Sequence, residues 1–242
     1  MVSKNDIKLI KQLEQKKHRQ RNGLFVAEGP KVVGDLLKSQ FTVQKIFSTP
    51  AYHSHLPIQT EITEEELQRI SFLQHPQQVL AVFRLPSAPQ HIEEPNGLSL
   101  ALDGVQDPGN LGTIIRIADW FGIDNIYCSH DTADAWNPKV VQATMGSIAR
   151  VHIYYVDLPD FLRSSRLPVY GTLLDGENIY TQELSGNAII VMGNEGNGIS
   201  PEVRPLISHR LFIPSYRQGD TAESLNVAIA TAITCAEFRR RG

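Results

Sequence analysis

The chain has 242 residues, a mass of 27.0 kDa and a formal net charge of −3 at pH 7. A chain of this length can bury a substantial core without disulfide or metal staples, so a mini-protein is excluded. Hydrophobic residues make up 41% and charged residues 20%, with a mean hydropathy of −0.20, which excludes a disordered or fibrous chain. No run approaches the roughly 20 consecutive apolar residues that a membrane-spanning helix requires.

Cysteine and histidine usage gives no sign of a disulfide framework or a metal site. Cys128 and Cys235 stand apart, without a C-x-x-C partner. The His53-x-His55 pair is more typical of a solvated loop than of a metal centre. The N-terminus also lacks the apolar core of a secretion signal. We therefore expect a cytoplasmic protein without a bound metal.

Positive charge is concentrated at the N-terminal end. Residues 1–45 carry ten Lys or Arg and four Asp or Glu, a net charge of +6, whereas the remaining residues sum to −9. Clustered Lys and Arg are typical of proteins that bind phosphate-rich polymers. The same residues could instead form only the solvated side of an N-terminal helix, and charge alone does not decide between these interpretations.

The residues before the first proline-rich stretch predict a small α/β module. Short β-branched or aromatic runs alternate with helix-like runs, the former at residues 24–27, 41–47 and 79–83 and the latter at residues 31–38 and 64–71. Thr63 followed by three glutamates suits the start of the second helix. Residues 85–97 contain three prolines and no apolar periodicity, and they predict a linker between domains.

After this linker, strand and helix patterns alternate more clearly. Buried strands are predicted at residues 98–102, 125–128, 151–156, 169–173, 188–192 and 210–213. Helices are predicted at residues 111–121, 139–147, 201–207 and 223–239. This order predicts a parallel sheet with helices on both faces. Ligands of such sheets bind in the loops at the carboxyl ends of the strands.

The first candidate loop reads DGVQDPGNLG, at residues 103–112, and follows a predicted strand. Asn110 suits a helix N-cap, and Arg116 follows it by less than two helical turns. The segment around Arg116 is largely apolar, and a buried arginine needs an acidic or phosphate partner.

Two further loops that follow predicted strands are rich in polar residues. The sequence GNEGNG, at residues 193–198, combines glycines that allow close backbone approach to a ligand with the carboxylate of Glu195. The loop at residues 213–227 contains Ser224 and Asn226, either of which could simply cap a helix. The usual dinucleotide and P-loop fingerprints are absent from the sequence.

In this order the three loops resemble the motifs of the SpoU (TrmH-like) RNA ribose methyltransferases, a branch of the SPOUT superfamily. The matching segments are NLGTIIRIADWFGI (residues 110–123), IVMGNEGNGIS (residues 190–200) and IPSYRQGDTAESLNVAIATAI (residues 213–233). The segment FVAEGPKVVGDLL (residues 25–37) is similar to the small RNA-binding domain that many family members carry at the N-terminus.

The resemblance implies a fold, an activity and a division into domains. It implies an α/β fold whose C-terminal parallel-sheet SPOUT domain contains a deep trefoil knot. It also implies that the protein forms a homodimer. It implies transfer of a methyl group from S-adenosylmethionine to a ribose 2'-hydroxyl of rRNA or tRNA. On this basis residues 1–84 are expected to bind the RNA substrate, residues 85–97 to form the linker, and residues 98–242 to form the methyltransferase domain.

The resemblance also assigns roles to individual residues. The catalytic residues that it implies are Asn110, Arg116, Glu195, Ser224 and Asn226. The cofactor contacts that it implies are Gly193, Gly196, Ile213 and Leu225, with a looser match for Thr172 and Leu173. RNA recognition relies on phosphates, 2'-hydroxyls and splayed bases, so the basic residues expected to hold RNA are Lys16, Lys17, Arg19 and Arg21. The loop at residues 215–223 is longer than is usual in the family, so the resemblance assigns it no contacts.

Methyl transfer from a sulfonium to oxygen is an in-line displacement, in which the protein supplies position and electrostatics. A ribose hydroxyl is a poor nucleophile, so it needs a base or a nearby cation. Arg116 is better suited to clamping a phosphate or stabilising an oxyanion than to accepting a proton, although the resemblance also implies an activating role. We expect Asn110, Ser224 and Asn226 to fix the geometry and Glu195 to organise the site.

Two other classes of protein are weighed against this interpretation. A non-catalytic RNA-binding protein on a methyltransferase scaffold is the stronger alternative, and retention of the five implied catalytic residues argues against it. An oxidoreductase with a nicotinamide cofactor would need a G-x-G-x-x-G loop after its first strand, which the sequence does not offer. The two-domain layout favours rRNA over tRNA as the substrate.

Overall fold

The computed structural model describes residues 1–52, 58–87, 95–217, 219 and 223–241. The chain divides into two compact units. The first unit comprises residues 1–88 and 134–150, and the second comprises residues 89–133 and 151–242. The His53-x-His55 pair and the central part of the predicted linker lie outside the described residues.

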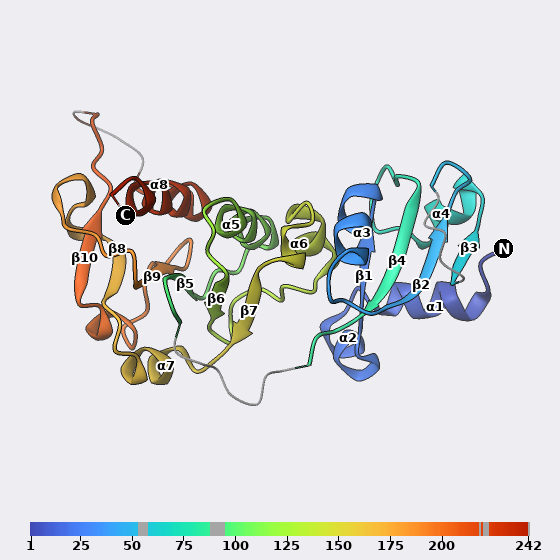
Figure 1. Ribbon diagram of the computed structural model, residues 1–242, viewed down its shortest axis with the longest axis horizontal. Coiled ribbons are helices and arrows are strands. Elements are labelled where there is room, and N and C mark those ends of the chain that lie inside the picture. The colour runs from blue at the N-terminus through green and yellow to red at the C-terminus, as the bar shows by residue number, and fades with distance from the viewer. Residues whose placement is uncertain (53–57, 88–94, 218, 220–222, 242) are drawn as a thin grey trace. The chain divides into compact units, whose positions relative to one another are not determined.

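The first unit is a small α/β domain with a four-stranded sheet (Figure 1). Its first part contains α1 (Lys4–Gln12), α2 (Lys16–Asn22), β1 (Leu24–Glu28), α3 (Pro30–Leu37), β2 (Val43–Ser48), β3 (Gln59–Glu61), α4 (Glu64–Ile70) and β4 (Val79–Arg84). The strand order is β1-β4-β2-β3, with β4 antiparallel to β1 and β2. The predicted strands and helices of this part are confirmed within two residues at each end, and the three-residue strand β3 was not predicted.

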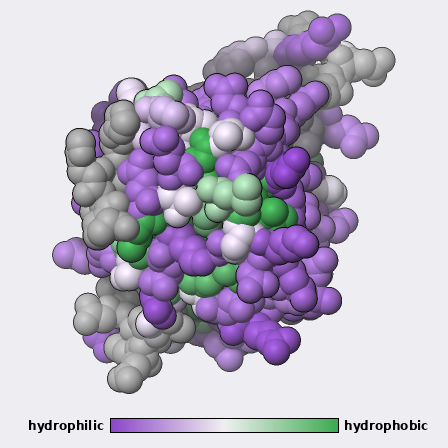
Figure 2. Space-filling model, turned by 90° about the vertical axis from the view of Figure 1, so that its right-hand side faces the viewer, coloured by the Kyte–Doolittle hydropathy of each residue, from purple (hydrophilic) through white to green (hydrophobic). Residues whose placement is uncertain are grey.

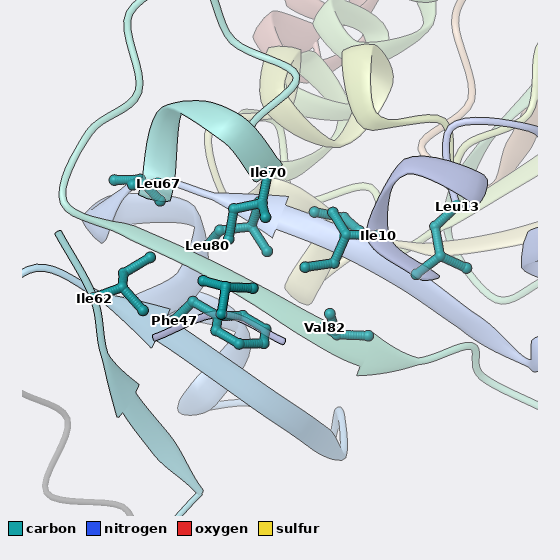
Figure 3. Close-up of a cluster of buried hydrophobic side chains, with 10 residues drawn as sticks. Ile10, Leu13, Phe47, Ile62, Leu67, Ile70, Leu80 and Val82 are labelled. Carbon is teal, nitrogen blue, oxygen red and sulfur yellow. The ribbon is translucent and has the colours of Figure 1, made fainter. Parts of the chain in front are cut away.

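A cluster of buried aliphatic and aromatic side chains joins the helices of this unit to its sheet. Figure 3 shows Ile10 of α1, Leu67 of α4, Phe47 of β2 and Leu80 of β4 pointing toward one another. These four side chains are each no more than 2% exposed. The start of α4 is fixed by a capping box, in which Thr63 and Glu66 each bond the other's backbone N–H. This confirms the predicted helix start.

Residues 134–150 belong to the first unit, although they lie far along the chain within the part that the sequence assigned to the methyltransferase domain. They contain α6 (Pro138–Ala143) and a 3-10 turn (Ser147–Ala149). The ring centroid of Trp136 lies 4.8 Å from that of Phe25 and 5.6 Å from that of Phe41. The helix predicted at residues 139–147 ends early, because Met145 and Gly146 adopt positive φ angles of 52° and 97°.

The second unit contains a six-stranded parallel sheet. Its elements are β5 (Leu98–Asp103), α5 (Pro108–Trp120), β6 (Asn125–Cys128), β7 (His152–Tyr155), α7 (Leu158–Ser164), β8 (Val169–Asn178), η2 (Ile179–Thr181), β9 (Ala188–Gly193), η3 (Arg204–Leu206), β10 (His209–Phe212) and α8 (Val227–Arg241). The strand order is β10-β8-β9-β5-β6-β7, and every neighbouring pair is parallel. This confirms the predicted α/β class and the parallel sheet.

Helices cover both faces of this sheet, as predicted. Figure 1 shows α5 and α8 along one face and α7 on the other. Successive residues of β9 point to opposite faces, and Ile189 and Val191 pack in a buried cluster with Leu158 and Leu162 of α7. No helix among the described residues is long and apolar enough to cross a membrane.

Two helix predictions for the second unit were inaccurate, and one helix was missed. The helix predicted at residues 201–207 is only the short turn η3, in which Pro205 lacks the N–H that a continuing helix needs. The final helix begins at Val227 rather than at position 223, because Asn226 accepts hydrogen bonds from Ala228 N and Ile229 N. Helix α7 was missed, although Asp157 provides a side-chain cap at its start.

Candidate active site

Two of the loops selected from the sequence emerge from neighbouring strands of the sheet. Strand β5 pairs in register with β9, from Leu98 opposite Ala188 to Asp103 opposite Gly193. Since parallel strands end at the same edge, the loop at residues 103–112 and the loop at residues 193–198 lie side by side. The third loop leads from β10 into α8, which packs against α5 and β9.

Glu195 connects the first two loops through three hydrogen bonds. Its Oε1 accepts from Asp107 N at 3.1 Å and from Asn110 Nδ2 at 3.0 Å. Its Oε2 accepts from Gln106 N at 3.2 Å. Partial burial disfavours the charged carboxylate, but these donors outweigh that effect and lower the pKa of Glu195. A carboxylate with a lowered pKa is a weak base, so Glu195 is suited to holding the loops together.

Asn110 continues this network to the third loop. Its Oδ1 accepts a hydrogen bond of 2.9 Å from Asn226 Nδ2. The Oδ1 of Asn226 in turn accepts from Ala228 N at 2.9 Å, at the start of α8. Each amide therefore donates to one neighbour and accepts from another, which fixes its orientation. The side chains of Glu195, Asn110 and Asn226 form one chain of hydrogen bonds across three loops.

The start of α5 differs from the prediction in a way that explains how Asn110 joins this network. The N-cap is Asp107, whose Oδ1 accepts from Asn110 N at 2.8 Å, and Pro108 occupies the first turn. Asn110 is therefore not the cap but a residue of the first helical turn, and its amide is free to bond Glu195 and Asn226. An Asp-Pro pair is itself a helix-start signal, so the sequence held the information for this cap.

Arg116 is exposed on α5, which overturns the expectation that an apolar segment would bury it. The neighbours that gave the segment its apolar character, Ile114, Ile115 and Ala118, are the ones that face the core. Among the described residues Arg116 makes no ion pair or hydrogen bond with another side chain. Its guanidinium is thus available to a phosphate or an oxyanion. Ser224 is also exposed, two residues before Asn226.

The residues expected at the cofactor lie at the same carboxyl edge of the sheet. Gly193 is tightly enclosed, because a Cβ there would lie 2.3 Å from the carbonyl carbon of Gly198. Thr172 donates a hydrogen bond of 3.6 Å to the sulfur of Met192 at the end of β9. The register of β10 on β8 jumps from Gly171 to Glu177, so Thr172 lies in a segment that bulges out of the ladder.

Apolar side chains near this edge suit the adenosine part of S-adenosylmethionine. Leu225 is 49% exposed, and Ile213 and Leu173 are partly buried. Gly196 follows Glu195 in the loop, and a Cβ there would meet nothing closer than Asn194 Oδ1 at 3.6 Å. A mostly apolar small-molecule site is typically lined by aliphatic side chains, with glycines where the backbone comes close to the ligand. The residues at this edge have that composition, so they fit the cofactor.

Sequence reasoning missed two residues that fix the loops of this site. Asn194 Nδ2 donates to Gly104 O at 2.7 Å, and its Oδ1 accepts from Gly196 N at 2.9 Å and from Asn197 N at 3.0 Å. Asp103 Oδ2 accepts from Ser200 N at 2.7 Å. Asn at the start of a glycine-rich turn is a recognised turn signal, whereas the bond from Asp103 joins loops distant in sequence and has no local signal.

The four basic residues expected to hold RNA differ in their environments. Lys16, Lys17 and Arg21 are exposed, whereas Arg19 is only 2% exposed. The guanidinium of Arg19 contacts Asp134 Oδ2 at 2.5 Å and donates to two backbone carbonyl groups of the turn after α1. Arg19 therefore has a structural role and is not available to RNA. Within the described residues, no group of three or more His, Cys, Asp or Glu is arranged to hold a metal ion.

Comparison with known proteins agrees with the fold and identifies the family. Residues 97–236 match the model of the SpoU rRNA Methylase family, and residues 4–81 match the MRM3-like substrate binding domain. The chain is 34% identical to the 23S rRNA (guanosine(2553)-2'-O)-methyltransferase RlmP of Bacillus subtilis, over 96% of this chain and 95% of that one.

Two solved structures resemble the whole chain. A putative RNA methyltransferase of the TrmH family from Porphyromonas gingivalis is 45% identical, with a TM-score of 0.90 and complete coverage of both chains. An AdoMet-bound rRNA methyltransferase from Sinorhizobium meliloti is 32% identical, with a TM-score of 0.86 and coverage of 99% and 97%. The fold and the loop network thus define an RNA methyltransferase on an α/β scaffold. The chain belongs to the SpoU rRNA methylase family, which confirms the resemblance seen in its motifs.

Proposed function

We propose that this protein transfers a methyl group from S-adenosylmethionine to a ribose 2'-hydroxyl of ribosomal RNA. The observation that carries the proposal is the hydrogen-bonded chain of Glu195, Asn110 and Asn226, which joins the three family motifs at one edge of the sheet. The names of the relatives support rRNA as the substrate. The AdoMet-bound relative from Sinorhizobium meliloti supports the cofactor.

In this mechanism the protein binds and orients the reactants. S-adenosylmethionine, when bound, supplies the activated methyl carbon. Arg116, which is exposed and permanently charged, holds the target phosphate and stabilises negative charge that develops on the attacking oxygen. Asn110 and Asn226 hold the geometry of the loops, with Ser224 beside them. Glu195 organises the site, and its lowered pKa makes it unsuited to accepting the hydroxyl proton.

The remaining expectations from the family become part of this proposal. We assign residues 1–84 to RNA binding, residues 85–97 to a linker and residues 98–242 to methyl transfer, and the family match at residues 4–81 and 97–236 supports this division. Lys16, Lys17 and Arg21 contact RNA phosphates. The deep trefoil knot and the cytoplasmic location stay predictions, and an rRNA substrate agrees with the latter.

The activity is tested with purified protein, radiolabelled S-adenosylmethionine and total RNA from a strain that lacks the gene. We expect label in rRNA that survives alkaline hydrolysis within a dinucleotide, because a 2'-O-methyl group blocks cleavage of the adjacent phosphodiester. Label confined to tRNA would correct the substrate. Absence of label in RNA and in assembly intermediates, despite measured cofactor binding, would favour the non-catalytic RNA-binding protein.

Replacement of Glu195 tests the loop network. In Glu195→Gln, an NH2 group replaces one of the two acceptor oxygens. An NH2 group is a donor, so it cannot accept a hydrogen bond from the backbone N–H of Gln106 or Asp107. Hydrogen bonds to charged groups contribute about 1.5–3 kcal/mol, so we expect kcat/KM to fall about 10- to 100-fold. Steady-state kinetics would measure this, with Glu202→Gln, an exposed residue seven positions away, as the matched control.

The pH dependence gives a second check on Glu195. Its pKa is lowered in the folded protein, so the carboxylate keeps its bonds as pH falls and loses them only below that lowered value. Glu195 therefore stays ionised at neutral pH, and the pH–rate profile of Glu195→Gln near neutral pH is expected to have the same shape as that of the wild type, at a lower rate. If the wild-type profile had an acid limb near neutral pH that disappeared in the variant, Glu195 would be the titrating base and the positioning role would be wrong.

We also propose that the homodimer forms through the exposed face of α5 and α8. Trp120, at the end of α5, is 85% exposed, and Ile229 of α8 is 53% exposed. The helices α5 and α8 pack against each other, and Val227, Ala228 and Phe238 of α8 are buried in its own unit, whereas Ile229 is not. Large apolar side chains that stand exposed on neighbouring helices are typical of a surface that another protein chain covers.

The oligomeric state of Trp120→Glu tests this face. A charge at the centre of an apolar interface is costly to bury, so we expect a dimeric wild-type protein and a monomeric variant. Light scattering after size-exclusion chromatography measures both masses. Leu174→Glu, at another exposed apolar residue that is 72% exposed, should remain dimeric. A variant Trp120→Glu that stays dimeric would place the interface elsewhere.

A further inference from the structure

The first unit contains a pocket that none of the predicted site residues lines. Its volume is about 410 Å³, within the range of about 300–1,000 Å³ typical of small-ligand sites. It lies between α4, the end of β2 and the loop before β4, and its lining residues are Thr49, Ala51, Glu64, Leu67, Gln68, Pro76, Gln77 and Gln78. Figure 2 looks onto the end of this unit that carries β3 and α4, where a small apolar area is surrounded by hydrophilic side chains.

The lining combines an apolar wall with an exposed polar rim. Leu67 is 2% exposed and belongs to the core cluster of Figure 3, so this wall of the pocket is fixed by the packing of the unit. The side chains of Glu64, Gln68, Gln77 and Gln78 are exposed around it. They offer amide donors and acceptors together with one carboxylate, and no Lys or Arg is among the eight lining residues.

The backbone at Gln78 is held in an unusual conformation beside this pocket. Gln78 has a φ of 54°, in the left-handed region that residues other than glycine seldom adopt. Val79 N donates to Gln77 O at 2.5 Å, which closes a tight three-residue turn around Gln78. Thr49 N donates to Gln78 O at 2.8 Å and anchors that turn to the end of β2. The surrounding structure therefore keeps the backbone of Gln78 in a conformation that glutamine by itself does not favour. As a result, the side chains of Gln77 and Gln78 stand next to each other at the rim of the pocket.

We propose that this pocket binds an unpaired base of the substrate RNA. This inference rests on the proposed function, because it assigns a specificity site to the RNA-binding unit of that enzyme. A pocket with a carboxylate and no cation does not attract a phosphate group, whereas base edges are read by amides and carboxylates in fixed positions. Apolar walls such as Leu67 and Pro76 suit the flat face of a base that has left its stack.

The carboxylate also limits which base the pocket accepts. The carboxylate of Glu64 can only accept hydrogen bonds, and the exocyclic amino groups of adenine, cytosine and guanine can donate to it. Uracil has no exocyclic amino group, and its one ring donor on that edge, the N3–H, lies between two carbonyl oxygens that the carboxylate repels. The pocket therefore selects a base with an amino group over uracil, while Lys16, Lys17 and Arg21 contribute contacts to phosphates that do not depend on sequence.

Short single-stranded RNAs test this selectivity without reference to methyl transfer. Fluorescence anisotropy with the full-length protein would compare oligo(A) and oligo(C) with oligo(U) of the same length, at two salt concentrations. We expect oligo(A) and oligo(C) to bind about tenfold more tightly than oligo(U). Salt should weaken all three, because phosphate contacts release counterions, but the ratio between them should stay nearly constant.

The double variant Gln77→Ala/Gln78→Gly removes the rim amides that hold the edge of the base toward Glu64, so it should bring this ratio close to one. Glycine accepts the positive φ at position 78, so the variant removes the side chains without straining the turn, and its thermal stability should match or exceed that of the wild type. Gln74→Ala, an exposed glutamine of the same loop outside the pocket lining, is the control and should keep the ratio.

Each outcome bears on the proposal. A wild-type protein that binds oligo(U) as tightly as oligo(A) and oligo(C), or a double variant that keeps the full preference, would show that the pocket is not a base site. A preference that is lost in the double variant supports the pocket, even if no rRNA becomes methylated. In that case the proposed enzymatic function alone would fail, so the two failures are distinguishable.

Discussion

Arg116→Ala is expected to lower kcat for rRNA methylation by about 100- to 1,000-fold, the usual cost of removing one group that stabilises an oxyanion. The guanidinium is exposed on α5 and makes no ion pair among the described residues, so its removal should leave the fold intact. The Kd for S-adenosylmethionine should stay close to the wild-type value. Single-turnover kinetics with labelled cofactor would separate the chemical step from binding.

Two further variants show whether the effect is specific to this position. Arg116→Lys keeps the charge but loses the two-pronged geometry of the guanidinium, so it should recover only part of the rate. Arg163→Ala removes an exposed arginine from α7, on the opposite face of the sheet, and should have wild-type activity. An Arg116→Ala protein with unchanged kcat would remove Arg116 from the mechanism.

Arg19→Ala is expected to destabilise the first unit by about 3–5 kcal/mol, because it leaves a buried partner uncompensated. Asp134, whose side chain is 13% exposed, would lose its counter-charge. The carbonyl oxygens of Leu13 and Glu14 would also lose the donor at Arg19 Nη1. The chain has two tryptophans, one in each unit, so a Trp120→Phe background leaves Trp136 as the fluorescent reporter of the first unit in urea unfolding.

A second replacement at the same pair separates charge from packing. Arg19→Met combined with Asp134→Leu removes both charges and should recover the part of the lost stability that comes from the unpaired carboxylate, since apolar replacements of buried ion pairs are often neutral, whereas Leu13 O and Glu14 O still lack the donor. Lys17→Ala, at an exposed residue of the same helix, should change RNA affinity without changing stability. Equal stability of Arg19→Ala and the wild type would contradict the structural role of this arginine.

The sequence predicted the parallel sheet well because its strands are continuous apolar runs bounded by turn residues. Strand β9, from Ala188 to Gly193, is buried over almost its whole length, and Asn125–Cys128 has the predicted bounds. The capping box at Thr63 and Glu66 depends only on residues 63–66, so the start of this helix could be predicted from four consecutive residues. Such features depend on neighbours in the chain and need no knowledge of the fold.

The errors arose where a residue's environment is set by distant parts of the chain. Arg19 looked like the other basic residues of α2, and its burial depends on Asp134, which lies 115 positions later. Arg116 lies in an apolar segment, yet α5 turns the apolar neighbours inward and leaves the arginine exposed. The hydrogen bonds that join Glu195 to Asn110 and Asn226 also cross between loops, so the sequence could nominate these residues but could not give their contacts.

The return of residues 134–150 to the first unit has a consequence for synthesis on the ribosome. Domains generally fold as units, with the N-terminal one first. Here the first unit is incomplete until its last segment, residues 134–150, has been made. That segment contains Asp134, Trp136 and α6, and it lies beyond the midpoint of the 242-residue chain. Strands β5 and β6 of the second sheet emerge before that point. The two units therefore complete their folding in an interleaved order rather than one after the other.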